Sequence, residues 1–281
     1  MTNQLKTGIL LGLLTALILL FGNLLGGQGG LMIAFVLAIA MNVGSYWFSD
    51  RIVLSMYKAH EVSSNQAPEL HGIVQELAAK AGLPKPRVFI IPGDAPNAFA
   101  TGRNPDHGVV AVTQGLLKLL SPEEIKGVLA HEMGHIKNRD ILIQTIAATM
   151  AGVIMFVSSM IKWAAIFGMG GDDEGGNPLL AIVLAIVAPI AAMLIQMAIS
   201  RSREYLADQS GAELAGNPRY LARALEKLDA YSKKAPAQQQ ANPATAHMFI
   251  VNPLSGSSIA SLFSTHPPIQ ERVKRLQGMA A

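Results

Sequence analysis

The sequence contains no cysteine. A disulfide framework is therefore excluded, and any metal ion must be held by histidine, aspartate or glutamate side chains. Charged residues are also scarce: they make up 15% of the chain, against about 25% in an ordinary soluble domain. Hydrophobic residues make up 51%, and the mean hydropathy is +0.35. This composition predicts a membrane protein that also carries a soluble part.

Runs of lysine or arginine are absent too, although the net charge is +3 and the pI is near 9.1. Proteins that bind nucleic acid gather their basic residues into a patch or stripe. The sequence therefore gives no support for nucleic acid as a partner.

The first long uncharged stretch lies between Lys6 and Asp50. A glycine-rich run at 26–30 divides it into apolar segments over 8–25 and 31–48, each close to the ~20 residues that span a bilayer. The alternative is a cleaved signal peptide, because an Ala-Ile-Ala triplet could serve as a cleavage site. Two such segments exceed the apolar core of about 7–15 residues that a signal peptide has. We therefore predict an N-terminal transmembrane hairpin over residues 1–50.

A second pair of uncharged segments covers residues 141–161 and 175–200. Pro178 suits the first position of a helix capped by Asn177, and Pro189 is expected to kink that helix. The alternative is a buried helical hairpin inside a soluble core. Length and lack of charge favour a second transmembrane hairpin, which makes four spans in all.

Basic residues near the ends of these segments gather on one side of the membrane when four spans are drawn. That side receives Lys6, Arg51, Lys58, Lys137, Arg139, Arg201 and Arg203. The opposite side receives the glycine run and a short acidic segment with one basic residue, Lys162. Because loops rich in lysine and arginine stay inside, both termini and the soluble parts are predicted to face the cytoplasm.

The soluble parts are predicted over residues 51–140 and 201–281. In the first, an amphipathic helix over 68–82 precedes three short extended runs separated by turns, which predict a small antiparallel sheet. These runs cover 87–91, 97–101 and 108–112. Ser121, Pro122 and Glu124 then form a capping box with proline at the first helical position, so a helix must begin there. In the second part, helices are predicted over 201–215, 218–232 and 268–276.

That capped helix carries His131-Glu132-Met133-Gly134-His135, which fits the pattern H-E-x-x-H. Side chains at i and i+4 share one helical face, so both imidazoles can bind one ion. Zinc lowers the pKa of a bound water to about 7, and the glutamate can accept its proton as the water attacks a carbonyl. The alternative is a coincidence with two solvated histidines. The motif predicts a zinc hydrolase with Glu132 as catalytic base.

Catalytic zinc takes three protein ligands and one water. The candidate for the third ligand is Glu204, because an antiparallel hairpin over 141–200 would return it to the end of the helix where His135 lies. Asp208 is one turn further along the same face, where it could accept a hydrogen bond from a ligand imidazole. The alternative is that both acids are solvated and pair with Arg201 and Arg203. Spacing alone leaves these two interpretations open.

Five features of the chain, in this order, resemble the HtpX-type membrane zinc metalloproteases, relatives of the CaaX prenyl-protease family. They are the N-terminal apolar hairpin, the segment 97–102 (NAFATG), the H-E-x-x-H motif, the segment 200–208, and 265–268 (THPP). The resemblance implies that His131, His135 and Glu204 bind one zinc ion per chain and that Glu132 is catalytic. It also implies turnover of damaged membrane proteins at the cytoplasmic (inner) membrane of a bacterium, often under heat stress.

The predicted fold class is therefore α+β: a mostly helical integral membrane protein with four transmembrane helices. Its protease domain is expected to be of the gluzincin type, with a small antiparallel sheet. The predicted partners are the lipid bilayer and membrane-protein or other polypeptide substrates, which could add as a strand to the sheet edge at 97–102. The alternative for this segment is an ordinary inner strand with Phe99 in the core. His266 could stabilise a developing oxyanion or simply structure the turn before two prolines.

Two other functions compete with this one. The first is a CaaX-type protease that processes prenylated tails, and the second is a non-catalytic membrane scaffold or chaperone with structural zinc. Structural zinc sites are closed by a fourth protein ligand, and the sequence offers no evident fourth residue.

Overall fold

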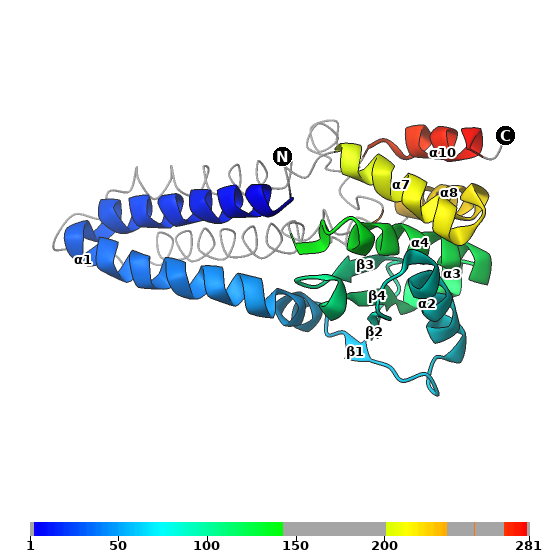
Figure 1. Cartoon of the computed structure of the whole chain (residues 1–281), viewed down its shortest axis with the longest axis horizontal. Helices are drawn as coiled ribbons and strands as arrows, with labels where there is room; N and C mark the ends of the chain where they lie inside the picture. The colour runs from blue at the N-terminus through cyan, green and yellow to red at the C-terminus, as the bar shows by residue number, and fades with distance from the viewer. Residues whose placement is uncertain (1–2, 143–200, 235–249, 251–266, 280–281) are drawn as a thin grey trace.

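The computed structural model describes residues 3–142, 201–234, 250 and 267–279 (Figure 1). The second predicted hairpin, apart from Ile141 and Leu142, lies outside these residues, and so does His266.

The N-terminal hairpin is formed by α1, Asn3–Met56, which is broken at Gly26 and Gly27 where the backbone leaves helical geometry. The break falls in the glycine run, and the two limbs of α1 extend together away from the sheet (Figure 1). Asn42 Nδ2 donates a hydrogen bond to Thr15 Oγ1 across the limbs at 2.8 Å. Within the described residues, one helical segment, Gly26–Phe48, is long and apolar enough to cross a membrane. The four predicted spans are thus not confirmed.

The sheet has four strands in the order β1-β2-β4-β3. Their bounds are β1 His60–Glu61, β2 Arg87–Ile91, β3 Ala98–Thr101 and β4 Val109–Thr113. β1 pairs with β2 and β3 pairs with β4 in antiparallel orientation, but β2 and β4 are parallel. The prediction of an antiparallel sheet was therefore wrong.

The physical reason lies in the connection between β2 and β3. The connection over residues 92–97 does not place β3 next to β2 but leaves room for one strand between them. β3 thus forms an edge of the described sheet, and β4 lies between β3 and β2. A turn signal predicts that the chain reverses, but it does not say which strand pairs with which. The reversal after β3, which contains the short 3₁₀ helix Pro105–His107, is the one that forms a hairpin.

Each face of the sheet is covered by a different part of the chain. Alternate residues of the strands, including Phe99, pack against Val53 and Leu54 at the end of α1, and the rings of Tyr57 and Phe99 lie 5.4 Å apart. The other face, including Ala98, belongs to the main core, which contains residues from most of the helices. These helices are α2 Pro68–Ala81, α3 Gln114–Leu119, α4 Pro122–Lys137, α7 Arg201–Ala215, α8 Pro218–Lys234 and α10 Ile269–Gly278.

The capping box that opens α4 is present as predicted. Ser121 Oγ accepts a hydrogen bond from the backbone N–H of Glu124, and Glu124 Oε2 accepts one from the backbone N–H of Ser121 at 2.8 Å. Lys227 of α8 also reaches Glu124 Oε2 at 2.7 Å. The start of α4 is therefore fixed both within the helix and against α8, and most of the helix beyond it is buried.

Two glycines allow α7 and α8 to approach α4 closely. A Cβ on Gly127 would lie 2.5 Å from the backbone nitrogen of Leu221 on α8, and a Cβ on Gly211 would lie 2.8 Å from Cα of His131. Real Cβ atoms do not approach backbone so closely, so either substitution requires the helices to move apart. The distance between α4 and α7 is thus set by the absence of a side chain at position 211.

We expect Gly211→Ala to lower the free energy of unfolding by about 1–3 kcal/mol, the usual effect of overpacking. It should also weaken metal binding, because α7 carries Glu204. Gly72→Ala on α2 is the matched control, since its Cβ would meet nothing within 4 Å and alanine favours a helix by about 1 kcal/mol over glycine. Denaturation of both variants in detergent measures the difference. Equal stability of Gly211→Ala and the wild type would contradict the close packing.

Candidate metal centre and active site

Three buried side chains from two helices converge on one point. The Nε2 atoms of His131 and His135 on α4 lie 3.2 Å apart. The carboxylate of Glu204 on α7 lies 3.7 Å from Nε2 of His131 and 3.6 Å from Nε2 of His135. In the described part of the chain, these three residues form a group whose ligand atoms all lie within 4.8 Å of one another. The sequence singled out these same residues.

The donor set suits a tetrahedral metal ion. Ligand atoms about 2.0–2.2 Å from a tetrahedral zinc stand roughly 3.3–3.6 Å from each other, close to the three separations in this cluster. Two imidazoles and one carboxylate are also the ligand types that zinc takes in catalytic sites. Glu204 and Asp208 are 1% and 2% exposed. Glu204 and Asp208 are therefore buried, and the alternative in which both acids are solvated is wrong.

Each imidazole of the cluster contacts a second carboxylate through its other ring nitrogen. Nδ1 of His131 lies 2.9 Å from Asp208, the contact expected from the sequence, and Nδ1 of His135 lies 3.1 Å from Asp140. Burial disfavours the charged form of His135, but Asp140, with help from Glu204, outweighs burial and raises the pKa of the metal-free imidazole to about 10. The sequence analysis missed Asp140, for which the available signal was an acid three residues after Lys137, the last residue of α4.

Arg272 of α10 is a further buried residue that sequence reasoning missed. Its Nε donates to Asp208 Oδ2 at 2.9 Å and its Nη2 donates to Asp208 Oδ1 at 2.7 Å. Burial favours the neutral acid, but Arg272 more than offsets this and lowers the pKa of Asp208 to about 2. Nη1 lies 3.9 Å from Glu204, and it donates to the backbone oxygen of Ile250 at 3.3 Å. The positive charge of the Arg272 guanidinium thus offsets the negative charges of Asp208 and Glu204.

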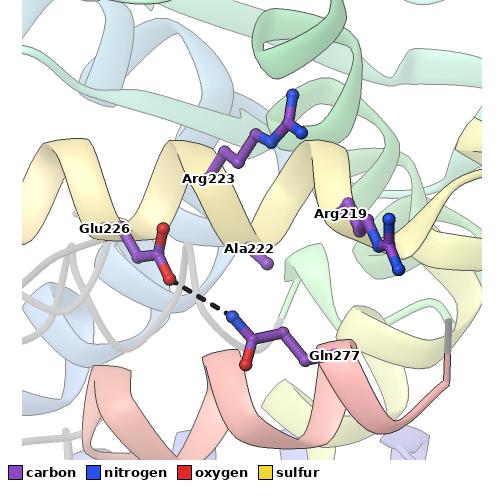
Figure 2. A pocket seen from close by; sticks show the side chains of 5 residues that line it. All are labelled: Arg219, Ala222, Arg223, Glu226 and Gln277. Carbon is purple, nitrogen blue, oxygen red and sulfur yellow. Dashed lines mark hydrogen bonds between the residues drawn. The ribbon is translucent and has the colours of Figure 1, made fainter. Parts of the chain in front are cut away.

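The helix that carries Arg272 is held against α8. Val273 and Leu276 lie in the main core together with Leu221 and Leu225 of α8. A cleft between the two helices is lined by Arg219, Ala222, Arg223 and Glu226 of α8 and by Gln277 of α10 (Figure 2). None of these five residues belongs to the metal cluster. The cleft therefore lies at the junction of α8 and α10 and shares no residue with the metal cluster.

Glu132 lies beside the cluster without joining it. Its Oε2 accepts a hydrogen bond from the backbone N–H of Ala100 in β3 at 2.8 Å. Burial raises the pKa of Glu132, although the neighbouring histidines oppose this. A carboxylate that is held by an edge strand and has an increased affinity for a proton suits a general base better than a metal ligand.

An H-E-x-x-H helix with two buried histidines, a converging glutamate and a separate acid beside them is the arrangement of a metalloprotease. The chain belongs to peptidase family M48, whose family model matches residues 64–280. A "Protease HtpX homolog" of Syntrophobacter fumaroxidans is 60% identical over 283 residues, which cover 99% of this chain and 100% of that protein. A protein of the same description from Pyrococcus furiosus is 56% identical over 276 residues, covering 98% and 95%. The resemblance to HtpX-type proteases is confirmed.

A solved structure is similar as well. The crystal structure of S. mikatae Ste24p matches with a TM-score of 0.51 and 20% sequence identity, covering 98% of this chain and 64% of that chain. At this identity the likeness concerns the fold alone. It agrees with the mostly helical architecture around a small mixed sheet.

Proposed function

We propose that this metalloprotease is a zinc-dependent endopeptidase of the cytoplasmic (inner) membrane of a bacterium. It cuts misfolded or damaged membrane proteins near the cytoplasmic face, in membrane protein quality control. The observation that carries the proposal is the buried convergence of His131, His135 and Glu204, with Glu132 held separately beside them. This arrangement supports the proposal, because hydrolysis requires both a metal-binding group and a base that does not bind the metal.

When bound, zinc would supply an acidified water and polarise the scissile carbonyl. Glu132 accepts the proton of the attacking water and later delivers it to the leaving amine. The N–H of Ala100 fixes the direction of the Glu132 carboxylate. Asp208 and Asp140 orient the two imidazoles through their Nδ1 atoms.

A structural zinc site is the main alternative from another class. Such a site would be closed by a fourth protein ligand, and among the described residues no fourth histidine or acid joins the group of three. A CaaX-type processing protease remains the second candidate enzyme, because the HtpX-type proteases that the sequence resembles are relatives of the CaaX prenyl-protease family. Digestion of an unfolded membrane protein and of a prenylated peptide, side by side, separates the two enzymes. Cleavage of the prenylated peptide alone would favour the second.

The test of the function is metal analysis together with casein digestion by the full chain in detergent. We expect about one zinc per chain, digestion of casein, loss of digestion on chelation, and recovery when zinc is added. Wild-type protein is expected to cut itself once zinc is present, so it should be purified with a chelator. A zinc-loaded, folded chain that cuts no polypeptide would contradict the proposal.

An extended substrate is proposed to bind along β3. Asn97 exchanges hydrogen bonds with Thr113, so the backbone groups of Ala98 and Ala100 point away from β4. Both alanines are buried, and Asn97 Oδ1 accepts a hydrogen bond from the backbone N–H of Ile250. The substrate must therefore enter a covered edge. Backbone hydrogen bonds there would bind many sequences, as a quality-control protease requires.

Proline substitutions distinguish the two alanines, because proline removes a backbone donor. Ala98→Pro should raise KM for a peptide with little change in kcat, since its N–H points away from β4, toward the proposed substrate strand. Ala100→Pro should lower kcat, since its N–H holds Glu132. Steady-state kinetics, with zinc content and unfolding midpoint as controls, measure both. An unchanged KM in a folded Ala98→Pro variant would place the substrate elsewhere.

The orientation in the membrane is tested by reporter fusions. Fusions after residues 50, 140 and 205 should read cytoplasmic, and a fusion near Asp172 should read external. An external signal at residue 140 would place the active site on the opposite side of the membrane. Labelling along the whole of 141–200 would indicate a hairpin that does not span the bilayer.

A further inference from the structure

We propose that Asp140 is a positioning residue of the metal centre: it holds the imidazole of His135 so that Nε2 points at the metal. The inference rests on the proposed zinc-dependent function. It assigns a role to a residue outside the H-E-x-x-H motif and outside the predicted ligand set.

The contact between Asp140 and His135 is short and buried, and it involves both oxygens of the carboxylate. Nδ1 of His135 lies 3.2 Å from Oδ1 and 3.1 Å from Oδ2 of Asp140, and Asp140 is 1% exposed. A neutral imidazole carries one N–H, and donating it from Nδ1 leaves the lone pair of Nε2 for a metal. Nε2 of His135 faces His131 and Glu204. Asp140 therefore selects both the tautomer and the ring orientation that the cluster needs.

The backbone turn after α4 places the side chain of Asp140 next to the imidazole of His135. After α4 ends at Lys137, Arg139 adopts a left-handed conformation with φ of 56°, which is uncommon for residues other than glycine. This reversal is closed by hydrogen bonds from the N–H of Arg139 to Ile136 O at 3.1 Å and from the N–H of Asp140 to His135 O at 3.2 Å. The turn that follows α4 thus places the carboxylate of Asp140 beside His135, the second predicted metal ligand of α4.

A buried carboxylate is not needed to end a helix. An ionised group taken out of water is costly unless it is paired, so a solvated residue would serve a simple helix end better. Here the charge of Asp140 acts on His135 and on buried Arg203, whose pKa is lowered by burial while Asp140 and Glu204 oppose that shift. The burial of Asp140 is explained by what it contacts rather than by the turn itself.

The two carboxylates behind the histidines are not equivalent. Asp208 accepts two hydrogen bonds from the guanidinium of Arg272, whereas the two oxygens of Asp140 lie 3.2 and 3.1 Å from Nδ1 of His135. Asp140 also directly precedes Ile141, where helical structure resumes. The orientation of His135 is therefore tied to the start of the segment predicted to form the second hairpin.

The test compares Asp140→Asn, Asp140→Ala and Asp140→Glu in the full chain in detergent. Zinc affinity is measured by competition with a chelating dye, the ligand field by the visible spectrum of the cobalt-substituted protein, and folding by thermal unfolding of the metal-free chain. Asp140→Asn should bind zinc about 10–100-fold more weakly, the usual effect of losing a partner of a ligand histidine. Its cobalt spectrum should shift while the unfolding midpoint stays close to that of the wild type. Asp140→Glu, which keeps the charge, should recover part of the affinity.

Arg139→Gly is the matched control, because glycine adopts the left-handed conformation freely. It should leave zinc affinity and the cobalt spectrum unchanged. An Asp140→Asn variant with wild-type affinity and spectrum would overturn the inference. If that variant fails to fold, Asp140→Ala decides: a wild-type cobalt spectrum would overturn the inference, and a shifted one supports it. A wild-type chain that binds no zinc would instead refute the proposed function.

Discussion

Glu132→Gln is expected to abolish proteolysis while the chain keeps about one zinc ion. The substitution preserves size and the hydrogen bond that Ala100 donates, but an amide cannot accept the proton of the attacking water. General-base catalysis contributes about 10²–10⁴-fold, so casein digestion should fall by at least that factor. Zinc content should not change, because Glu132 is not part of the converging ligand group. Digestion rate and metal analysis on the same preparation measure both quantities.

Glu123→Gln provides the matched control for this experiment. Glu123 lies in the first turn of the same helix and is exposed, so its variant should retain full activity. The Glu132→Gln chain should also resist self-cleavage when zinc is added. Substantial residual peptidase activity in that variant would rule out Glu132 as the base.

Glu204→Ala is expected to have the second largest effect, a loss of bound zinc and of activity together. Glu204 supplies the only carboxylate of the three converging ligands, and two histidines on one helix leave half of a tetrahedral ion without protein donors. Asp208→Asn should weaken zinc binding less, by about 10–100-fold, because it acts through His131. Asparagine is preferable to alanine at this position, because its amide oxygen can still accept a hydrogen bond from the buried guanidinium of Arg272.

Zinc titration of the metal-free variants measures these differences. Glu213→Ala, an exposed acid on the same helix, should bind zinc as the wild type does. If Glu204→Ala binds as tightly as that control, the third ligand lies elsewhere. If Asp208→Asn and Glu204→Ala lose the same affinity, the two acids do not have the distinct roles assigned to them.

The features that the sequence predicted well are those with a local cause. The capping box at Ser121 and the spacing of His131 and His135 are set within one helix, so they can be read from adjacent residues. The proximity of Glu204 was predicted from the return of a hairpin and from the family resemblance, and the structure places Glu204 within the cluster.

The features that were missed depend on packing between distant segments. Arg272 stands in an amphipathic helix with charged neighbours, where one buried arginine looks like any solvated one. Gly211 carries no chemical signal, yet its missing side chain sets the distance between the two helices that hold the metal ligands. The parallel pairing of β2 and β4 depends on which side of the sheet the 92–97 connection crosses. Local patterns do not contain that choice.

Anomalous X-ray diffraction at the zinc edge, on crystals of the full chain carrying Glu132→Gln, tests the central claim most directly. The account predicts one zinc per chain between Nε2 of His131, Nε2 of His135 and the Glu204 carboxylate, at about 2.0–2.2 Å from each. Its remaining position should hold no protein atom. A zinc peak at another place, or a fourth protein side chain that closes the coordination sphere, would contradict a catalytic centre built from these residues.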